Sequence, residues 1–453
     1  MSRCATTSSR CRHCSAADTR RGRRGGDTGG RAGARPAARW RPARRTGTAL
    51  ALWCLACLPA GALAQGLEQR GFAEVVFTGY PQEAANDPTQ AVADGLFRYE
   101  ATWRHSAWKL DGSLDARFDS HDMTERRLDV AYWDRTVQRP VLAVRRLSAS
   151  WAHRFLTLEA GKQFVRWGKT DIVTPTDRFA PRDYLGVVNN DVLAVTAARA
   201  VAASNADSLE VVFTPQMTPS RMPLLDQRWI VLPPAASGLA ITDEGARYPG
   251  GWQGGVRWNH IGAHLEHSVS AFRGFDHLPL VEVSVAPALR GVAVWREYPQ
   301  LTAVGADVVA PLPWLTLKAE AAWLGSDTPG AQELVLYVVQ AERQAGEWLF
   351  IGGYVGEHVT REPRTFRFSP DRGLARAVFG RGSLTIDTNR SLTIESVVRQ
   401  NGDGVFGRFE YSQAVGAHWR LTGQAVIFRG VDGDYLGQYR KNSFGAVTLR
   451  FSF

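Results

Sequence analysis

A short polar stretch holds the first residues whose types and spacing could do chemistry. Between residues 162 and 183 the chain places eight charged side chains of both signs: Lys162, Arg166, Lys169, Asp171, Asp177, Arg178, Arg182 and Asp183. Charged groups around a narrow passage can select a polar solute, because rings of charge set which ions and molecules enter. The same groups can instead tie an exposed loop to its neighbours through salt bridges worth ~0–1 kcal/mol each. The sequence alone leaves both interpretations open.

Covalent and metal chemistry have weaker support. The chain contains no Gly-x-Ser-x-Gly motif of the kind that presents a nucleophilic serine. A cluster of His260, His264 and His267 could suggest zinc, but no acid stands at a recognised ligand spacing from it. All five cysteines precede residue 65, so thiolate sites and disulfides are excluded from the rest of the chain. We therefore predict no catalytic residue, no metal site and no cofactor, and the chain is not expected to be an enzyme.

The positive charge of the protein belongs to one end. Residues 1–45 contain thirteen Arg, no Lys and two acids, whereas residues 65–453 carry 41 basic and 42 acidic side chains. An uncharged stretch, 46–64, follows the arginines and ends with small residues at Ala62 and Ala64 before Gln65. This order predicts an Arg-rich low-complexity leader over 1–45, a signal peptide over 46–64 cleaved before Gln65, and Sec export. A nucleic-acid partner is not expected.

The exported part, 65–453, shows apolar and polar residues in alternation. In one stretch Leu317, Ala319, Ala321 and Trp323 fall on one face, and Thr316, Lys318 and Glu320 fall on the other. Similar alternation recurs about every 20–25 residues with turn signals between, and no apolar run approaches the ~18 residues of a spanning helix. A soluble β-sandwich would bury its apolar face, but mid-strand charges on the other face suit a watery lumen. We predict an all-β fold: a transmembrane antiparallel up-and-down barrel of about 16 strands, in the range 14–18.

The last strand carries the clearest single motif. Val447, Leu449, Phe451 and Phe453 share one face of a strand that ends on a C-terminal phenylalanine. This resembles the outer-membrane β-signal, the closing strand that the barrel-assembly machinery recognises. A closing strand must pair with the first strand to remove both sheet edges. The motif predicts a barrel in the outer membrane of a Gram-negative bacterium, in contact with its lipid.

A second resemblance covers residues 147–183 and a few later blocks. Residues 158–171 read Leu-Glu-Ala-Gly-Lys-Gln-Phe-Val-Arg-Trp-Gly-Lys-Thr-Asp, followed by Pro175-Thr-Asp177 and Pro181-Arg-Asp183. The pattern resembles that of the alginate-export-like and DUF1302-like outer-membrane barrels of proteobacteria. It departs from them at Ala180, where that group tends to have Asn. Blocks at 209–215, 220–223 and 272–279 look like further parts of the pattern. The resemblance implies the fold and the location of the protein, but it says almost nothing about the substrate.

Three functions follow for such a barrel. The first is a porin-like channel for an unidentified small solute. The second is a conduit that exports a polysaccharide or lipid with periplasmic partners, which only the family resemblance supports. The third is an outer-membrane hydrolase, which has the least support. The sequence does not name the solute, the direction of transport or the oligomeric state.

Overall fold

The computed structural model describes residues 66–231, 240–286, 291–362 and 370–453, all of which belong to one compact unit. The leader, the signal peptide and the cleavage site at Ala62, Ala64 and Gln65 lie outside the described residues. No helix within the described ranges is long and apolar enough to cross a membrane.

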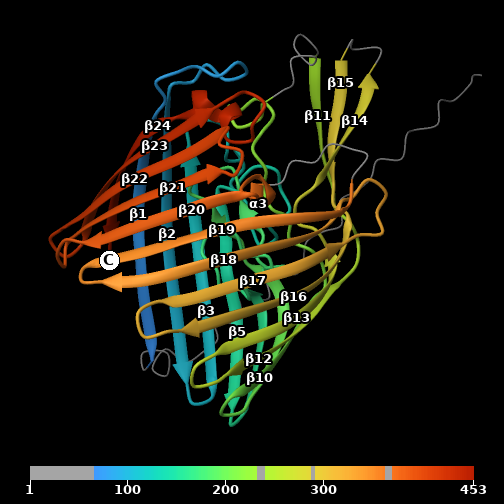
Figure 1. Ribbon diagram of the computed structural model, residues 1–453, viewed down its shortest axis with the longest axis vertical. Coiled ribbons are helices and arrows are strands. Elements are labelled where there is room, and N and C mark those ends of the chain that lie inside the picture. The colour runs from blue at the N-terminus through green and yellow to red at the C-terminus, as the bar shows by residue number, and fades with distance from the viewer. Residues whose placement is uncertain (1–65, 232–239, 287–290, 363–369) are drawn as a thin grey trace, which may run out of the picture. The chain divides into compact units, whose positions relative to one another are not determined.

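Antiparallel strands form one closed barrel, shown in Figure 1. Its first nine strands are β1 (Leu67–Gly79), β2 (Ala91–His105), β3 (Trp108–Asp119), β5 (Leu142–His153), β6 (Leu156–Gln163), β9 (Val195–Ala203), β10 (Asp207–Thr214), β12 (Gln253–Ile261) and β13 (Glu266–Phe275). The other nine are β16 (Gln300–Pro311), β17 (Thr316–Gly325), β18 (Glu333–Ala345), β19 (Trp348–Arg361), β20 (Ala377–Thr385), β21 (Arg390–Arg399), β22 (Gly404–Val415), β23 (Trp419–Gly430) and β24 (Phe444–Ser452). Within the described ranges the barrel thus has 18 strands, which corrects the central prediction of 16 and lies at the upper limit of the predicted range.

Pairing of β24 with β1 closes the barrel, as the last-strand motif predicts. The register runs from Phe72 opposite Ser452 to Gly79 opposite Gly445. The backbones of Gly71 and Phe453 exchange two hydrogen bonds of 3.0 Å. The Phe453 ring lies over Gly71, where a Cβ atom would come within 2.5 Å of it, and stacks on Phe97 at a centroid distance of 6.0 Å. Closure satisfies the backbone groups that two open edges would leave unpaired.

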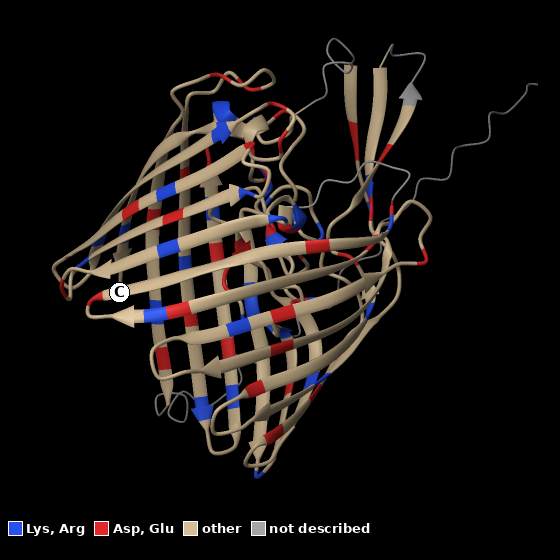
Figure 2. Ribbon diagram, viewed as in Figure 1, with Lys and Arg blue, Asp and Glu red and all other residues tan. Residues whose placement is uncertain are grey.

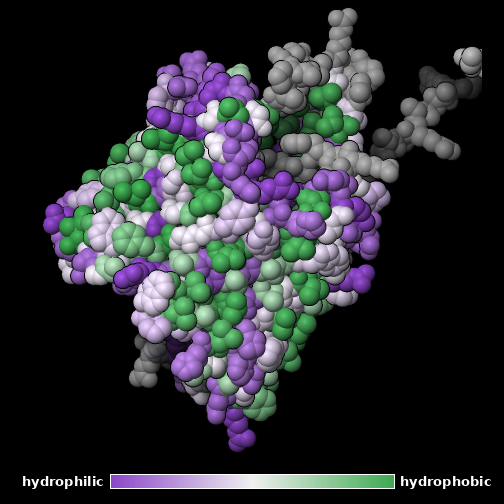
Figure 3. All heavy atoms as spheres, in the orientation of Figure 1, coloured by the Kyte–Doolittle hydropathy of each residue, from purple (hydrophilic) through white to green (hydrophobic). Residues whose placement is uncertain are grey.

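The two faces of the strands match the predicted alternation. On β17, Lys318 and Glu320 point into the lumen and pair with inward groups, while Leu317 and Trp323 are exposed on the outside. Charged bands accordingly cross the middle of many strands in Figure 2. Large apolar side chains such as Phe77, Val339 and Phe409 are exposed on the outer surface. Hydrophobic residues are spread over the barrel wall in Figure 3, as contact with lipid requires.

The two ends of the barrel differ. At the end where β1 begins and β24 ends, called here the turn end, the connections have two to four residues, as at 346–347 and 416–418. The opposite end, the loop end, carries the long connections, including 120–141, 164–194, 215–252 and 276–299. Short turns face the periplasm and long loops the outside in bacterial barrels.

Small elements decorate the loop end. Strands β11 (Ala240–Arg247), β15 (Gly291–Glu297) and β14 (Leu280–Ala286) form a separate three-stranded sheet with β15 in the middle. The two-residue strands β4 (Val130–Ala131), β7 (Arg182–Asp183) and β8 (Asp191–Val192) lie in the loops at 120–141 and 164–194. A one-turn helix α3 (Pro370–Gly373) and a 3₁₀ helix η3 (Gly437–Asn442) complete the described elements.

Candidate functional site: the interior of the barrel

The loop at 164–194, called the insertion loop, packs inside the barrel. Its side chains Val165, Trp167 and Phe179 are almost fully buried. The Phe179 ring meets Trp167 edge-on at 5.2 Å and meets Phe272 of the wall strand β13 edge-on at 5.0 Å. The same apolar cluster includes Leu334 of β18. An apolar core thus joins the insertion loop to one side of the lumen.

One carboxylate sets the start of this loop. The Asp177 carboxylate accepts hydrogen bonds from the backbone N–H groups of Trp167 and Gly168, at 2.6 and 2.8 Å, and pairs with Arg166 at 3.1 Å. At Gly168 a Cβ atom would come within 2.6 Å of Thr174. The Trp-Gly pair and the later Asp of the sequence motif therefore form one hydrogen-bonded unit. This unit follows β6, which ends at Gln163.

A second carboxylate holds the loop against the wall. Glu320 of β17, which is 2% exposed, accepts hydrogen bonds from the backbone N–H groups of Lys169, Thr170 and Thr176 at 2.7–3.2 Å. The hydroxyls of Thr170 and Thr176 donate to it as well, at 2.9 and 2.8 Å. Gln340 of the next strand hydrogen-bonds to Asp171. A buried carboxylate with so many donors is well satisfied, and its removal would leave several polar groups unpaired.

An ionic cluster joins three loops at the centre. The Asp134 carboxylate lies 2.6 Å from both Lys162 and Arg221, and the Asp183 carboxylate lies 2.8 Å from Arg139 and 3.2 Å from Arg221. All five side chains are buried. Burial alone would raise the pKa of Asp183, but the two arginines hold that pKa well below its usual range. Three cations thus share two carboxylates, and the cluster ties the loops at 120–141, 164–194 and 215–252 together.

The other predicted site residues are mostly paired too. Lys169 lies 2.7 Å from Glu266, and Asp171 lies 3.5 Å from Lys318. Arg182 donates to the side-chain oxygen of Asn190 at 2.9 Å, and the buried Arg178 lies within the loop itself. The eight residues therefore come together inside the barrel but not as a ring of free charge. In this structure they join the loop to the wall.

Several residues of this arrangement were not predicted as site residues. Asp134, Arg139 and Glu320 lie far from the insertion loop in the sequence and show no distinctive spacing. Glu320 is recognisable only as an inward position of an alternating strand. Arg221 does fall in the block Ser220–Pro223 of the family resemblance, which was the one available signal.

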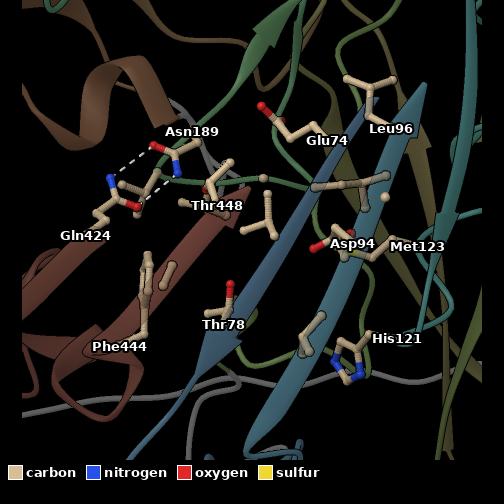
Figure 4. Close-up of a pocket in the computed structure, with 18 of the residues that line it drawn as sticks. Glu74, Thr78, Asp94, Leu96, His121, Met123, Asn189, Gln424, Phe444 and Thr448 are labelled. Carbon is tan, nitrogen blue, oxygen red and sulfur yellow. Dashed lines mark hydrogen bonds between the residues drawn. The ribbon is translucent and has the colours of Figure 1, made fainter. Parts of the chain in front are cut away.

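The opposite side of the lumen is open. A cavity of about 490 Å³ lies between the end of the insertion loop and the wall strands β1–β3 and β22–β24. Glu74, Thr78 and Thr448 face it in Figure 4. Asn189 of the loop and Gln424 of β23 exchange hydrogen bonds of 3.1 and 3.4 Å across its border (Figure 4). The insertion loop therefore leaves this cavity, called here the passage, along one wall of the lumen.

The charges of this passage balance. Its lining contains five carboxylates, Glu74, Asp87, Asp94, Asp191 and Glu410, and five arginines, Arg117, Arg139, Arg228, Arg420 and Arg450. Some are paired across the lumen, as Arg450 is with Glu74 at 2.6 Å. Arg420 stands in register with Arg450, is exposed, and donates to the Ser412 hydroxyl at 3.0 Å. A balanced lining of this kind favours neither cations nor anions by its net charge.

The histidine cluster lies elsewhere. His260 of β12 and His267 of β13 are direct cross-strand partners with ring centroids 5.2 Å apart, so the two share a face. A tight hairpin causes this, because it brings residues of the two strands into register. His260 also lies 3.0 Å from Asp207. Among the described residues, no group of three or more His, Cys, Asp or Glu is arranged to hold a metal ion.

Comparison with solved structures identifies the fold. The chain is similar to OccAB4 of Acinetobacter baumannii, with a TM-score of 0.53, 8% identity, and coverage of 86% of this chain and 98% of that one. It is also similar to a BenF-like porin from Pseudomonas fluorescens, with a TM-score of 0.49, 8% identity and coverage of 86% and 98%. For OpdQ of Pseudomonas aeruginosa the TM-score is 0.48 and the identity 10%, and the match covers 85% of this chain and 97% of that one.

No family model matches the chain, and no curated protein matches it. At these low identities the likeness to OccAB4 defines the architecture alone. The architecture is a closed antiparallel barrel like that of OccAB4, as the alternation and the last strand predict.

Proposed function

We propose that this protein is a channel of the Gram-negative outer membrane that passes small solutes along the passage between its insertion loop and strands β1–β3 and β22–β24. The observation that carries the proposal is the 490 Å³ cavity with a polar, charge-balanced lining on the one side of the lumen that the loop leaves open. Polar side chains of both signs can replace water around a small hydrophilic solute without holding it. The exposed apolar side chains on the outer surface support a barrel that crosses a membrane.

A matched pair of substitutions on one strand tests the proposal. Thr448 of β24 lines the passage, while its neighbour Val447 points outward and is 49% exposed. We expect Thr448→Trp to reduce the single-channel conductance of the purified protein in planar bilayers at least severalfold, because the indole would fill the passage. Val447→Trp should leave conductance unchanged, since an aromatic side chain is compatible with lipid. A wild-type protein without conductance, or equal effects of the two substitutions, would contradict the proposal.

Export of a polysaccharide or lipid, and hydrolysis, stay alternatives. Deletion of the gene distinguishes the first, because loss of a secreted polymer would indicate an export conduit. Membership of the alginate-export-like and DUF1302-like group also stays a proposal. Its support is that Gly168 and Asp177 of the motif form one structural unit around the insertion loop. Sec export, the barrel-assembly machinery and periplasmic partners remain predictions from the sequence.

A further inference from the structure

The outer wall of the barrel contains a groove that the channel function does not use. It has a volume of about 620 Å³ and lies over strands β18–β21, at the side nearer the turn end. Its lining includes Trp314, Trp348, Phe350 and Ile394, and its floor is made largely by the outward positions of β19 and β20. Its size lies within the range of ~300–1,000 Å³ that small-molecule sites occupy.

Glycines create the hollow. Gly352 and Gly380 are cross-strand partners, and Gly382 follows two residues later on the same face. A Cβ atom at Gly352, Gly380 or Gly382 would meet no atom closer than 3.6 Å. The packing of the barrel therefore leaves room for larger side chains at these three positions. Small residues there keep an apolar depression open on a surface that faces lipid.

A cation stands at the rim of the groove. Arg343 of β18 lines it, two residues before that strand ends at the turn end. Its guanidinium lies over the Trp314 ring, 6.0 Å from the ring centroid. Arg343 is in register with Phe350, whose ring stacks on Trp348 at 5.4 Å. In the part of the chain that the structure describes, no carboxylate pairs with Arg343. An outward arginine among aromatic rings at a membrane interface is placed to meet a lipid phosphate.

From these observations we propose that the groove binds one phospholipid of the periplasmic leaflet, with an acyl chain along Gly352, Gly380 and Gly382 and the phosphate on Arg343. The apolar floor and aromatic walls match a hydrocarbon chain, and the unpaired guanidinium matches a phosphate monoanion. The binding site is on the outside of the barrel, so the inference stands or falls separately from the channel function.

Native mass spectrometry of the full-length purified protein in a non-ionic detergent tests the inference, with dioleoyl phosphatidylglycerol and dioleoylglycerol as probes. We expect one phosphatidylglycerol to be retained, and dioleoylglycerol, which lacks the phosphate, to bind about tenfold more weakly, because a charge-assisted hydrogen bond contributes about that factor. Arg343→Gln should weaken phosphatidylglycerol binding to the level of dioleoylglycerol. Gly380→Leu should abolish the binding of both lipids, because the side chain fills the groove.

Two matched controls distinguish the site from the general lipid surface. Gly423→Leu places the same side chain at another outward glycine with open space around it, on β23. Arg273→Gln removes another exposed outward arginine, on β13. Both controls should bind phosphatidylglycerol as the wild type does, and Gly380→Leu should keep the wild-type conductance. The proposal would be overturned if the controls lost phosphatidylglycerol binding equally, or if the protein retained the two lipids equally. It would also be overturned if the protein formed a dimer that Gly380→Leu disrupts, since the groove would then bind a second copy of the chain.

Discussion

The wall strands on the two sides of the lumen have similar inward-facing polar residues, but these residues are buried on one side and exposed on the other. On one side, Glu320 of β17 and Gln340 of β18 are buried beneath the insertion loop. On the other side, Arg420 of β23 is exposed, and its neighbours Thr422 and Gln424 line an open passage. Both sets are polar residues at inward positions of alternating strands. The difference comes from where the loops pack.

Inserted loops reduce the open cross-section of this wide barrel. An 18-stranded barrel without inserted loops would enclose a broad aqueous lumen. Here the ionic cluster around Asp134 and Asp183 joins three loops, and Glu320 and the Phe179 contacts hold one of them against the wall. The side of the lumen that the insertion loop covers, called the filled side, is held rigid by these contacts. The side it leaves uncovered, called the open side, contains the passage. Substitutions on the two sides should therefore have different consequences.

The largest effect is expected at the centre of the filled side. Arg221→Gln removes the cation shared by Asp134 and Asp183, and each carboxylate keeps only one cationic partner, Lys162 or Arg139. We expect a loss of ~3–5 kcal/mol in the stability of the folded loops, because two buried hydrogen bonds between charged groups, each worth ~1.5–3 kcal/mol, are lost together. Guanidinium titration of the protein in lipid vesicles, with hydrogen exchange of residues 120–141 and 164–194, measures it. Wild-type exchange rates in both segments would refute the role of the cluster.

A second substitution releases the insertion loop from the wall. Glu320→Ala leaves three backbone N–H groups and the Thr176 hydroxyl without their acceptor, and water entry should limit the cost to ~2–4 kcal/mol. In planar bilayers we expect a larger single-channel conductance, with faster openings and larger fluctuations of the open-channel current. Glu395→Gln is the control, because that buried carboxylate pairs with Arg381 at 2.6 Å on the wall and does not contact the loop. The idea fails if both variants conduct like the wild type.

Acid should loosen the loop end before the rest of the barrel. Burial lowers the pKa of His277 from 6.5 to about 4, and Asp276 opposes the shift. Because the unfolded loop binds the proton more readily, this stabilising contribution is complete above pH 6.5 and decreases as the pH falls toward 4. At pH 5 the loss is about 2 kcal/mol by linkage. The stabilising contribution of Asp183 does not change between pH 7 and pH 5, since the folded state lowers its pKa from 3.8 and the contribution is lost only as the pH falls below that value.

Hydrogen exchange at pH 7 and pH 5 measures the effect, with rates corrected for the intrinsic pH dependence. Residues 276–286, next to His277, should lose protection at pH 5 in the wild type. The His277→Gln variant should show no such change, because glutamine does not titrate. Equal acid sensitivity in both proteins would assign it to other groups.

The smallest effect on stability is expected on the open side. Arg420→Ala removes an exposed side chain whose hydrogen-bond partner is the Ser412 hydroxyl, so we expect a change below ~0.5 kcal/mol in unfolding free energy. The permeability ratio of cations to anions should nevertheless rise, because one positive charge leaves a balanced passage. The reversal potential in a salt gradient measures the ratio. An unchanged reversal potential would place the route of permeation elsewhere.

The sequence by itself determined the barrel and its two faces. Alternation at residues such as Lys318, Glu320 and Trp323 assigns each side chain to the lumen or to lipid, because a β-strand has a period of two. The closing motif at Phe451 and Phe453 determined how the sheet ends. The estimate of 16 strands was low because long loops and short strands such as β6 and β9 leave weak signals.

Only the tertiary structure decided which inward residues are covered. Asp134, Asp183 and Arg221 are separated by dozens of residues, and nothing local requires them to meet. The charges at 162–183 could have stayed in water at little cost, as a surface loop does. They fold inward because Trp167 and Phe179 gain apolar contacts there. In addition, the Glu320 carboxylate, on a strand distant in the sequence, lies where it can accept hydrogen bonds from the loop backbone. Such long-range matches depend on the closed barrel, which brings every wall strand around one loop.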